Sequence, residues 1–272
     1  MSEQFYFFKN PDPTKEKTTA AIARQAAETI YASQRTTDIA SASYVIAHGG
    51  DGTMLDTLRE IAHYKEKHPE WTVPKTIGIN YGDVGYLMNK PTVDFNTLIA
   101  TAKVVYVHPL EATIRDEAGK TYRRIAFNDF VAHSDSRNGQ SCHLKVNAIG
   151  LKPINDVVVK GNGIVISTPM GSSAYFRNAG GHPFPIWSHS FGIQPICSVD
   201  AVGKIGGYYH CSQKVVIDVL NEKKKRPVYA NTDNDERIDN IAHCEIVCSQ
   251  QAFPILMGHH CPARNPLLYQ GR

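Results

Sequence analysis

The stretch SYVIAHGGDGTML, residues 43–55, decides the fold. A short apolar run, Tyr44 to Ala47, meets three glycines around one carboxylate, Asp51, and an apolar helical pattern follows from Thr53. A buried strand, a glycine-rich turn and a helix in this order are typical of an α/β layer with a mainly parallel sheet. Ligands of such sheets bind beyond the carboxyl ends of the strands, which is where this turn is expected.

The glycine-rich turn indicates a phosphate site. Glycine has no Cβ, so we expect the backbone at Gly49, Gly50 and Gly52 to take positive φ and to approach a ligand closely. Together with Thr53, their N–H groups would cradle a phosphate. Asp51 suits this place only if it handles a proton or faces Mg²⁺, as a kinase requires. The alternative is an ordinary turn with Asp51 as a helix cap. Neither GxxxxGK[ST] nor the GxGxxG dinucleotide fingerprint is present.

Strands and helices alternate over residues 1–104, which predicts an α/β domain. The expected strands are QFYFFKN, Tyr44–Ala47 and Thr76–Ile79, and the expected helices are Lys15–Ser33, Thr53–Lys67 and VDFNTLIATA. Short β-rich runs such as KVVYVHPLEATIR, VVVKGNGIVIS and KVVIDVL dominate residues 105–249, and turn signals separate several of them. This pattern of short β-rich runs and turns predicts a mainly antiparallel second domain. The tail, residues 250–272, shows no clear period.

Bulk properties exclude several classes of protein. The chain has 272 residues, 42% hydrophobic and 20% charged, which is typical of a globular protein. A net charge of +3 argues against a nucleic-acid partner, and no apolar run is long enough to span a membrane. The N-terminus lacks the features of a signal peptide, so we expect a cytoplasmic protein. The basic run Lys223–Arg226 is interpreted as a solvated loop.

The six cysteines are scattered and are expected to stay reduced. A zinc site is conceivable at the end of the chain, where five possible ligands occur: Cys244, Cys248, His259, His260 and Cys261. The interpretation as ordinary strand and tail residues is favoured.

Further segments have two interpretations each. Tyr86 offers an aromatic face to an adenine ring or packs in the core. Asn128 can donate and accept at a purine edge, or cap a turn in a hairpin. Ser172 and Ser173 would expose hydroxyls at a helix start, with or without a ligand. VVVKGNGIVIS reads as a strand–turn–strand pair, in which Gly161–Gly163 is a tight turn.

In chain order these segments resemble those of one family. They are GGDGT at 49–53, GINYGDVGYL at 78–87, FNDF at 127–130, and KGNGIVISTPMGSSAY at 160–175 followed by NAGG. Together they resemble the motifs of NAD kinases, members of a superfamily with diacylglycerol-type lipid kinases and phosphofructokinases. The resemblance implies a Rossmann-like α/β N-terminal domain, a mainly antiparallel β second domain that contributes to the NAD site, and a tail that returns to the first domain.

The resemblance also implies roles. Asp51 would orient the adenosine 2′-hydroxyl of NAD and accept its proton, while Gly49, Gly50, Gly52 and Thr53 hold the phosphates of ATP or polyphosphate. The residues expected to contact NAD are Asp51, Gly52, Tyr86, Asn128, Asp129, Lys160, Asn162, Ser173, Ala174, Tyr175 and Asn178. Mg²⁺ would accompany ATP, with no fixed protein metal site and no tightly bound cofactor. The Gly161–Gly163 turn would reach a neighbouring subunit, which implies a homodimer or homotetramer.

Several positions depart from the family pattern. Asp129 replaces a usual Glu, Asn162 a usual Asp and Asn178 a usual Ser, and either Asn231 or Asp233 stands for an aspartate late in the chain. These departures fall on residues expected to grip the acceptor. Two alternatives therefore stay open: a kinase of the same superfamily acting on another hydroxyl, of a nucleoside or a lipid, and a non-catalytic dinucleotide-binding protein.

Overall fold

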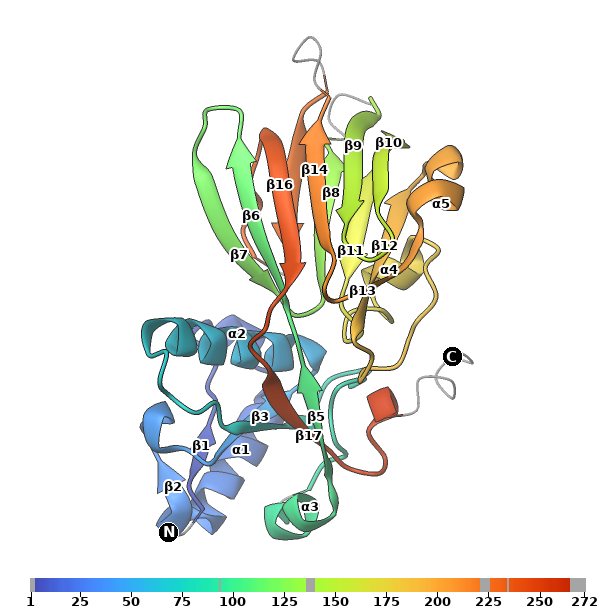
Figure 1. Cartoon of the computed structure of the whole chain (residues 1–272). Helices are drawn as coiled ribbons and strands as arrows, with labels where there is room; N and C mark the ends of the chain where they lie inside the picture. The colour runs from blue at the N-terminus through green and yellow to red at the C-terminus, as the bar shows by residue number, and fades with distance from the viewer. Residues whose placement is uncertain (1–2, 93, 136–139, 221–225, 234, 265–272) are drawn as a thin grey trace. The chain divides into compact units, whose positions relative to one another are not determined.

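A computed structural model of the chain describes residues 3–92, 94–135, 140–220, 226–233 and 235–264. It divides into two compact units (Figure 1), which are described separately. Unit 1 comprises Met1–Val107 and Ala252–Arg272, and unit 2 comprises His108–Gln251. No helix of the described part of the chain is long and apolar enough to span a membrane.

Unit 1 contains a six-stranded sheet in the order β2-β1-β3-β4-β17-β5. The neighbouring strands pair in parallel, except that β5 runs antiparallel to β17 at one edge. This sheet confirms the predicted α/β domain with mainly parallel strands. The strand bounds are Phe5–Phe7 for β1, Arg35–Thr36 for β2, Tyr44–Gly49 for β3, Lys75–Asn80 for β4, Lys103–Val107 for β5 and Phe253–Met257 for β17.

In the part of unit 1 that the structure describes, the α-helices are α1 (Thr18–Ile30), α2 (Asp51–Lys67) and α3 (Phe95–Thr101). Both α1 and α2 contact β3, every residue of which is buried. The first helix is shorter than predicted, because Lys17 at its start has an extended backbone and Pro13–Lys15 form a separate 3₁₀ turn.

The tail supplies a strand that the sequence pattern did not indicate. β17 is inserted between β4 and β5, although it contains Pro254, which lacks an N–H for a sheet ladder. The parallel pairing with β4 involves only Ile255 and Leu256, so the proline lies outside that ladder. The buried side chain of Asn89 joins the two strands, since its amide donates to the carbonyls of Gly78 (2.9 Å) and Leu256 (3.1 Å).

Unit 2 consists of two sheets whose strands pair antiparallel throughout, as the sequence predicted. The first has the order β10-β9-β14-β16-β6-β7 and the second β13-β12-β11-β8-β15. The bounds are Leu110–Asp116 (β6), Thr121–Ala126 (β7), Asp129–Ser134 (β8), Cys142–Ile149 (β9), Ile154–Gly161 (β10), Gly163–Ser167 (β11), Ser190–Ile196 (β12), Gly207–His210 (β13), Lys214–Val219 (β14), Val228–Thr232 (β15) and Ile241–Cys248 (β16), with the helices Tyr175–Asn178 (α4) and Val199–Ile205 (α5).

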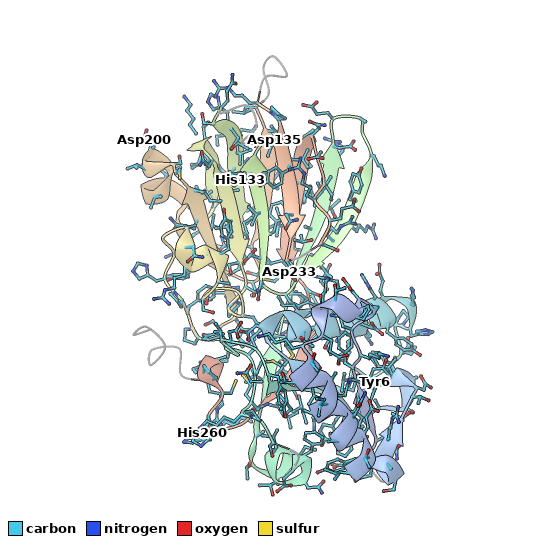
Figure 2. All side chains as sticks on the ribbon, turned by 180° about the vertical axis from the view of Figure 1, so that it is seen from behind. Tyr6, His133, Asp135, Asp200, Asp233 and His260 are labelled. Carbon is cyan, nitrogen blue, oxygen red and sulfur yellow. The ribbon has the colours of Figure 1, made fainter. Side chains whose placement is uncertain are left out.

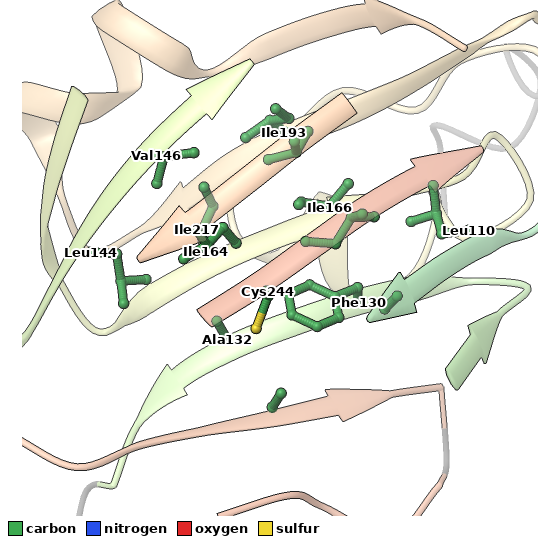
Figure 3. Packing of buried hydrophobic residues seen from close by; sticks show 14 of the residues in the cluster. Leu110, Phe130, Ala132, Leu144, Val146, Ile164, Ile166, Ile193, Ile217 and Cys244 are labelled. Carbon is green, nitrogen blue, oxygen red and sulfur yellow. The ribbon is translucent and has the colours of Figure 1, made fainter. Parts of the chain in front are cut away.

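The core of unit 2 lies between these two sheets (Figure 3). Leu144 and Ile217 from the first sheet pack with Phe130 and Ile166 from the second, and all four are fully buried. β9 alternates buried and partly exposed residues along its length, as expected of a strand with one face in a core. Burial of such side chains contributes roughly 1.5–3 kcal/mol each to stability.

Two interpretations as hairpins are wrong: the alternative given for Asn128 and the strand–turn–strand pair around Gly161–Gly163. β7 and β8 belong to different sheets, and so do β10 and β11, so the chain crosses from one sheet to the other at Asn128 and again at Asn162. The run KVVYVHPLEATIR is likewise divided, because β5 belongs to the sheet of unit 1 and β6 to unit 2. Short β-rich runs predict strands but carry no information on which sheet each strand joins.

Candidate active site

The glycine-rich loop of unit 1 joins β3 to α2. Gly49 is the last residue of β3, Gly50 precedes the helix with an extended backbone (φ −110°, ψ −167°), and Asp51 is the first helical residue. The first N–H groups of an α-helix have no acceptor within the helix and carry its positive dipole. The N–H groups of Asp51, Gly52 and Thr53 are therefore suited to phosphate oxygens.

Gly49 and Gly50 are constrained by space and not by an unusual backbone, whereas a Cβ on Gly52 would meet no protein atom within 4 Å. None of Gly49, Gly50 and Gly52 has a positive φ, which corrects the sequence-based expectation. A Cβ on Gly82 would lie 2.7 Å from the Cα of Gly50, a separation that real side chains do not adopt. The loop after β3 and the loop after β4 therefore meet backbone to backbone, so the glycine-rich loop is bounded on one side by the backbone at Gly82.

Asp51 is held by the loop that follows β4. Its Oδ2 accepts from the backbone N–H of Tyr86 (3.0 Å) and its Oδ1 from that of Leu87 (2.8 Å). The side chain makes no capping bond to its own helix, so the helix-cap alternative is wrong. A carboxylate has about four acceptor positions, so each oxygen of the partly exposed Asp51 can still accept from a hydroxyl.

Tyr86 contributes backbone groups to this arrangement. Besides its N–H on Asp51, its carbonyl accepts from the N–H of Ala263 (2.9 Å), so the tail fixes the segment that holds the acid. The side chain is only 5% exposed and packs in unit 1. Stacking of an adenine ring on Tyr86 remains a prediction, and it requires this ring to become accessible.

In unit 2, Asp233 organises the turn between β7 and β8. Its carboxylate accepts from the N–H groups of Phe127 (2.7 Å), Asn128 (2.7 Å) and Asp129 (3.1 Å). Figure 2 shows Asp233 near one end of the β8 sheet, while His133 lies further along. Of the two positions that the sequence left open, Asp233 is thus the one whose carboxylate touches the FNDF segment.

A second turn packs against Asn128. The Thr168 N–H donates to the Asn128 carbonyl (2.9 Å), and the Thr168 hydroxyl donates to the Phe127 carbonyl (2.5 Å). A Cβ on Gly171 would collide with the backbone of Asn128, so only glycine allows this contact. Within the described residues, the buried Oδ1 of Asn128 has no hydrogen-bond partner. Leaving a buried acceptor without a donor costs free energy, so Oδ1 of Asn128 is a candidate contact for a group that donates a hydrogen bond.

Asp129 is a buried carboxyl beside another one. It is 7% exposed, and its N–H shares Asp233 as acceptor with Phe127 and Asn128. Burial, and then the negative charge of Asp233, raises the pKa of Asp129 to about 7. Its protonation state therefore changes near neutral pH.

The segment STPMGSSAY is arranged differently from the expectation. The Ser172 hydroxyl is fully buried and donates to the Pro169 carbonyl (2.8 Å), so it is not exposed at a helix start. The short helix α4 begins later, at Tyr175, and Ala174 precedes it as the N-cap residue. Ser173 and Ala174 remain partly exposed, and the Tyr175 ring is 38% exposed. The charge of Asp129 helps to raise the pKa of Tyr175, after burial and Tyr229, which indicates that these side chains are near one another.

The remaining predicted NAD contacts are exposed. Asn178 ends α4, and Lys160 lies near the end of β10. In the pairing of β11 with β8, Ser167 faces Asp129 whereas Gly163 faces His133, so Asn162 lies at the far end of β11 from the Asn128 turn. Lys160 and Asn162 are therefore not brought to that turn within this chain.

The alternative zinc site gains no support. Cys244 and Cys248 belong to unit 2, whereas His259, His260 and Cys261 belong to unit 1. Within the described residues, no three His, Cys, Asp or Glu side chains gather as metal ligands. Of the basic run, Lys223–Lys225 lie outside the described residues, and Arg226 donates to the Ser141 carbonyl (2.9 Å).

Comparison with known proteins decides the family. No family model matches the chain. The NAD kinase of Xanthomonas campestris pv. campestris (strain 8004) is 32% identical over 199 residues, which is 72% of this chain and 72% of that protein. The chain belongs to the NAD kinase family. A further member, the NAD kinase of Rickettsia prowazekii (strain Madrid E), is 28% identical over 216 residues, or 79% of each chain.

Solved structures of NAD kinases share the fold. The NAD kinase from Archaeoglobus fulgidus in complex with ATP has a TM-score of 0.67 at 17% identity, covering 99% of this chain and 97% of that one. The yeast NADH kinase complexed with NADH has a TM-score of 0.77 at 15% identity, covering 99% and 88%. The predicted family, fold and enzyme class, a kinase that phosphorylates NAD, are thereby confirmed.

Proposed function

We propose that this NAD kinase transfers the γ-phosphate of ATP to the adenosine 2′-hydroxyl of NAD, with Asp51 as the residue that orients this hydroxyl and accepts its proton. The observation that carries the proposal is the pair of N–H bonds that holds the Asp51 carboxylate at the start of α2, inside the phosphate loop. A proton acceptor fixed beside a phosphate site suits phosphoryl transfer.

The proposed reaction forms one bond, breaks one bond and transfers one proton. The 2′-oxygen forms a bond to the γ-phosphorus, the bond from that phosphorus to the β–γ bridging oxygen breaks, and ADP leaves. The hydroxyl proton passes to Asp51. The backbone N–H groups of Gly52 and Thr53 would hold phosphate oxygens of the donor while this happens. The protein's part is thus positioning and electrostatic stabilisation.

Mg²⁺ is expected to come with ATP. It offsets the negative charge of the phosphates when bound. Asp51 is the carboxylate of the loop, and each of its oxygens can make one contact beyond its N–H bond. This single carboxylate fits a Mg²⁺ ion that is bound mainly by phosphate oxygens.

The residues of unit 2 are proposed to recognise the acceptor. The orphaned Oδ1 of Asn128 would accept from the adenine amino group, and Asp129 would accept from a ribose hydroxyl. Tyr175 would lie against the dinucleotide, next to Ser173 and Ala174. Asn128 enters these assignments through its unsatisfied oxygen, Ser173, Ala174 and Tyr175 through their exposure, and Asp129 through its place beside Asn128.

The exposed residues Lys160, Asn162 and Asn178 complete the proposed NAD site. The far-end position of Asn162 on β11 fits a turn that serves a neighbouring subunit's site, so we propose a homodimer or homotetramer. Sedimentation velocity of the purified protein, with and without NAD, tests the assembly. A monomer at all concentrations would contradict it.

The activity test incubates purified protein with NAD, ATP and Mg²⁺ and detects NADP by a coupled dehydrogenase. A parallel panel replaces NAD by NADH, a nucleoside or a diacylglycerol, and ATP by polyphosphate. We expect phosphorylation of NAD, with the other acceptors slower. Phosphorylation of only the nucleoside or the lipid would contradict the assigned acceptor. Tight NAD binding in calorimetry without product from any donor would point to a non-catalytic binding protein.

A further inference from the structure

Two cysteines far apart in the sequence meet in unit 2. Cys211 lies in the turn His210–Gln213, which connects β13 of one sheet to β14 of the other, and Cys248 is the last residue of β16. β14 and β16 are neighbours in which Val215 faces Ile246, so their register continues towards Gln213 and Cys248. Cys211 packs against the buried cluster that includes Cys248, and the interaction between the two thiols shifts the pKa of each.

We propose that Cys211 and Cys248 form a site of reversible oxidation, in which a low-molecular-weight disulfide such as oxidised glutathione converts the thiol pair into an intramolecular disulfide. This property is separate from the kinase activity. All six cysteines of the chain are free thiols in the structure, so the pair is present in its reduced form.

The surroundings assign different roles to the two thiols. Cys211 is partly exposed, whereas Cys248 is 6% exposed. The interaction with Cys248 lowers the pKa of Cys211, while the interaction with Cys211 and burial raise the pKa of Cys248. An accessible thiol of lowered pKa beside a second thiol is the arrangement of redox-sensitive cysteines with a resolving partner. Cys211 is thus the attacking thiol and Cys248 the resolving one.

The exchange occurs in two balanced steps. The Cys211 thiolate attacks one sulfur of oxidised glutathione, forms a mixed disulfide and releases one glutathione thiolate. The Cys248 thiolate then attacks the Cys211 sulfur, forms the Cys211–Cys248 bond and releases the second glutathione thiolate. The two protein thiols supply the two electrons, and their two protons protonate the two glutathione molecules.

Oxidation should stabilise unit 2. The new bond would tie the turn that crosses between the sheets to the end of β16, closing a long loop of chain. Closing such a loop reduces the entropy of the unfolded chain, so we expect the melting temperature to rise by roughly 5–10 °C.

The test exposes the full-length protein to oxidised glutathione and follows free thiols, intact mass and disulfide-linked peptides. The expected product has four free thiols out of six, no bound glutathione on this pair and a Cys211–Cys248 peptide. C248S should retain glutathione on Cys211, because the resolving thiol is missing, and C211S should form no disulfide at Cys248. C197S, which removes an exposed thiol of unit 2, should still form the disulfide.

Two results would overturn the proposal, and a third would remove only the inferred stabilisation. One is modification of Cys197 alone in the wild type. Another is glutathione that stays on Cys211 in the wild type as it does in C248S. The third is an unchanged melting temperature in protein shown by mass to carry the Cys211–Cys248 bond, which would remove the inferred stabilisation.

Discussion

Both units hold a loop by hydrogen bonds from backbone N–H groups to one aspartate, but they use the aspartate differently. In unit 1 the carboxylate of Asp51 accepts two N–H groups, from Tyr86 and Leu87. In unit 2 the carboxylate of Asp233 accepts three, from Phe127, Asn128 and Asp129. In the first case the loop positions the acid that is proposed to react, and in the second the acid positions a loop whose side chains are proposed to bind.

The two sites differ in which carboxyl group remains able to exchange a proton once the N–H bonds are formed. Asp51 is partly exposed at the start of a helix, where a negative charge is favoured. In unit 2 the N–H groups donate to Asp233. The neighbouring Asp129 is buried close to the negative charge of Asp233, and its pKa is raised to about 7. A fixed carboxylate thus serves chemistry in one unit, while in the other it makes a nearby carboxyl sensitive to pH.

The largest expected effect comes from Asp51→Asn. The amide can still accept one N–H bond but cannot take up the hydroxyl proton, so turnover should fall by about 10²-fold or more. NAD affinity should stay within about threefold, since the side chain keeps its shape. Initial rates of NADP formation give turnover, and calorimetry gives NAD affinity.

The matched control is Asp83→Asn, which removes an exposed carboxylate that forms an ion pair with Lys17 in the same unit. This variant should keep its turnover, because exposed ion pairs contribute little. Equal losses of turnover in both variants, or no loss in Asp51→Asn, would contradict the role assigned to Asp51. The contrast between Asp51 and Asp233 would then no longer hold.

Asp233→Asn tests the second half of the comparison. The amide cannot accept three N–H groups as a carboxylate does, so the Asn128 turn should loosen. We expect a loss of roughly 2–3 kcal/mol in the free energy of unfolding and a KM for NAD raised by about tenfold, with turnover less affected. Denaturant unfolding and steady-state kinetics measure the two effects.

Asn231→Ala is the control for this variant, because Asn231 lies in β15 two residues before Asp233 and its side chain donates to the Asp235 carbonyl (2.8 Å) instead of holding the Asn128 turn. It should raise KM less than Asp233→Asn does. The reverse order would mean that Asn231, and not Asp233, takes the aspartate's place in the family pattern.

The sequence predicted the parts of the fold that depend on local patterns. The stretch from Tyr44 to Leu55 indicated a strand, a phosphate loop and a helix, and the structure has β3 and α2 there. The tail strand was missed, since Pro254 and a short apolar run do not resemble a central strand. The hairpins at Asn128 and Asn162 were wrong because alternation along a strand cannot tell which sheet the next strand joins.

The site was predictable only as a set of residue types. The acid Asp51 could be named from its glycine neighbours, but its partners are backbone N–H groups of Tyr86 and Leu87, which any residue type could supply. Asp233 was one of two candidates for the same reason, since only three-dimensional structure shows which carboxylate reaches the turn. Thr168 was missed as a positioning residue, although a hydroxyl beside a proline turn was a signal for it.

Asp129→Asn examines the pH sensitivity of unit 2. The pKa of Asp129 is about 7 in the folded protein, above the value near 3.9 of an unfolded aspartate. The unfolded chain therefore loses this proton first, and stability falls as pH rises from about 4 to 7. The asparagine variant avoids this loss, so its gain in unfolding free energy over wild type should be larger at pH 8 than at pH 5 by on the order of 2 kcal/mol.

Denaturant unfolding at the two pH values, without NAD, measures this difference. Asp200→Asn serves as the control, since Asp200 is an exposed carboxylate in the first turn of α5 (Figure 2). It should show no comparable change between pH 5 and pH 8. An equal gain for Asp129→Asn at pH 5 and pH 8 would mean that the carboxyl is already ionised at pH 5 and that its pKa is not raised.

The smallest expected effect concerns His48, the residue before the glycine loop. It is 3% exposed, its ring stacks on Phe7, and within the described residues neither ring nitrogen has a hydrogen-bond partner. Burial, aided by the charge of Arg24 and partly opposed by Glu16, lowers its pKa to about 4. His48→Leu removes the two unsatisfied nitrogens and should raise the free energy of unfolding by about 1 kcal/mol at pH 7.

The pH dependence of this gain separates hydrogen bonding from packing. An unfolded histidine takes up a proton near pH 6.5, which the folded His48 does not do until about pH 4, so wild-type stability falls as pH drops through this range. The advantage of His48→Leu should therefore grow between pH 7 and pH 5, whereas exposed His63→Leu on α2 should show no such growth. A loss of stability at both pH values would mean that packing of the imidazole against Phe7 contributes more free energy than its two unsatisfied nitrogens cost. The buried polar ring would then be needed to hold the strand that leads to Asp51.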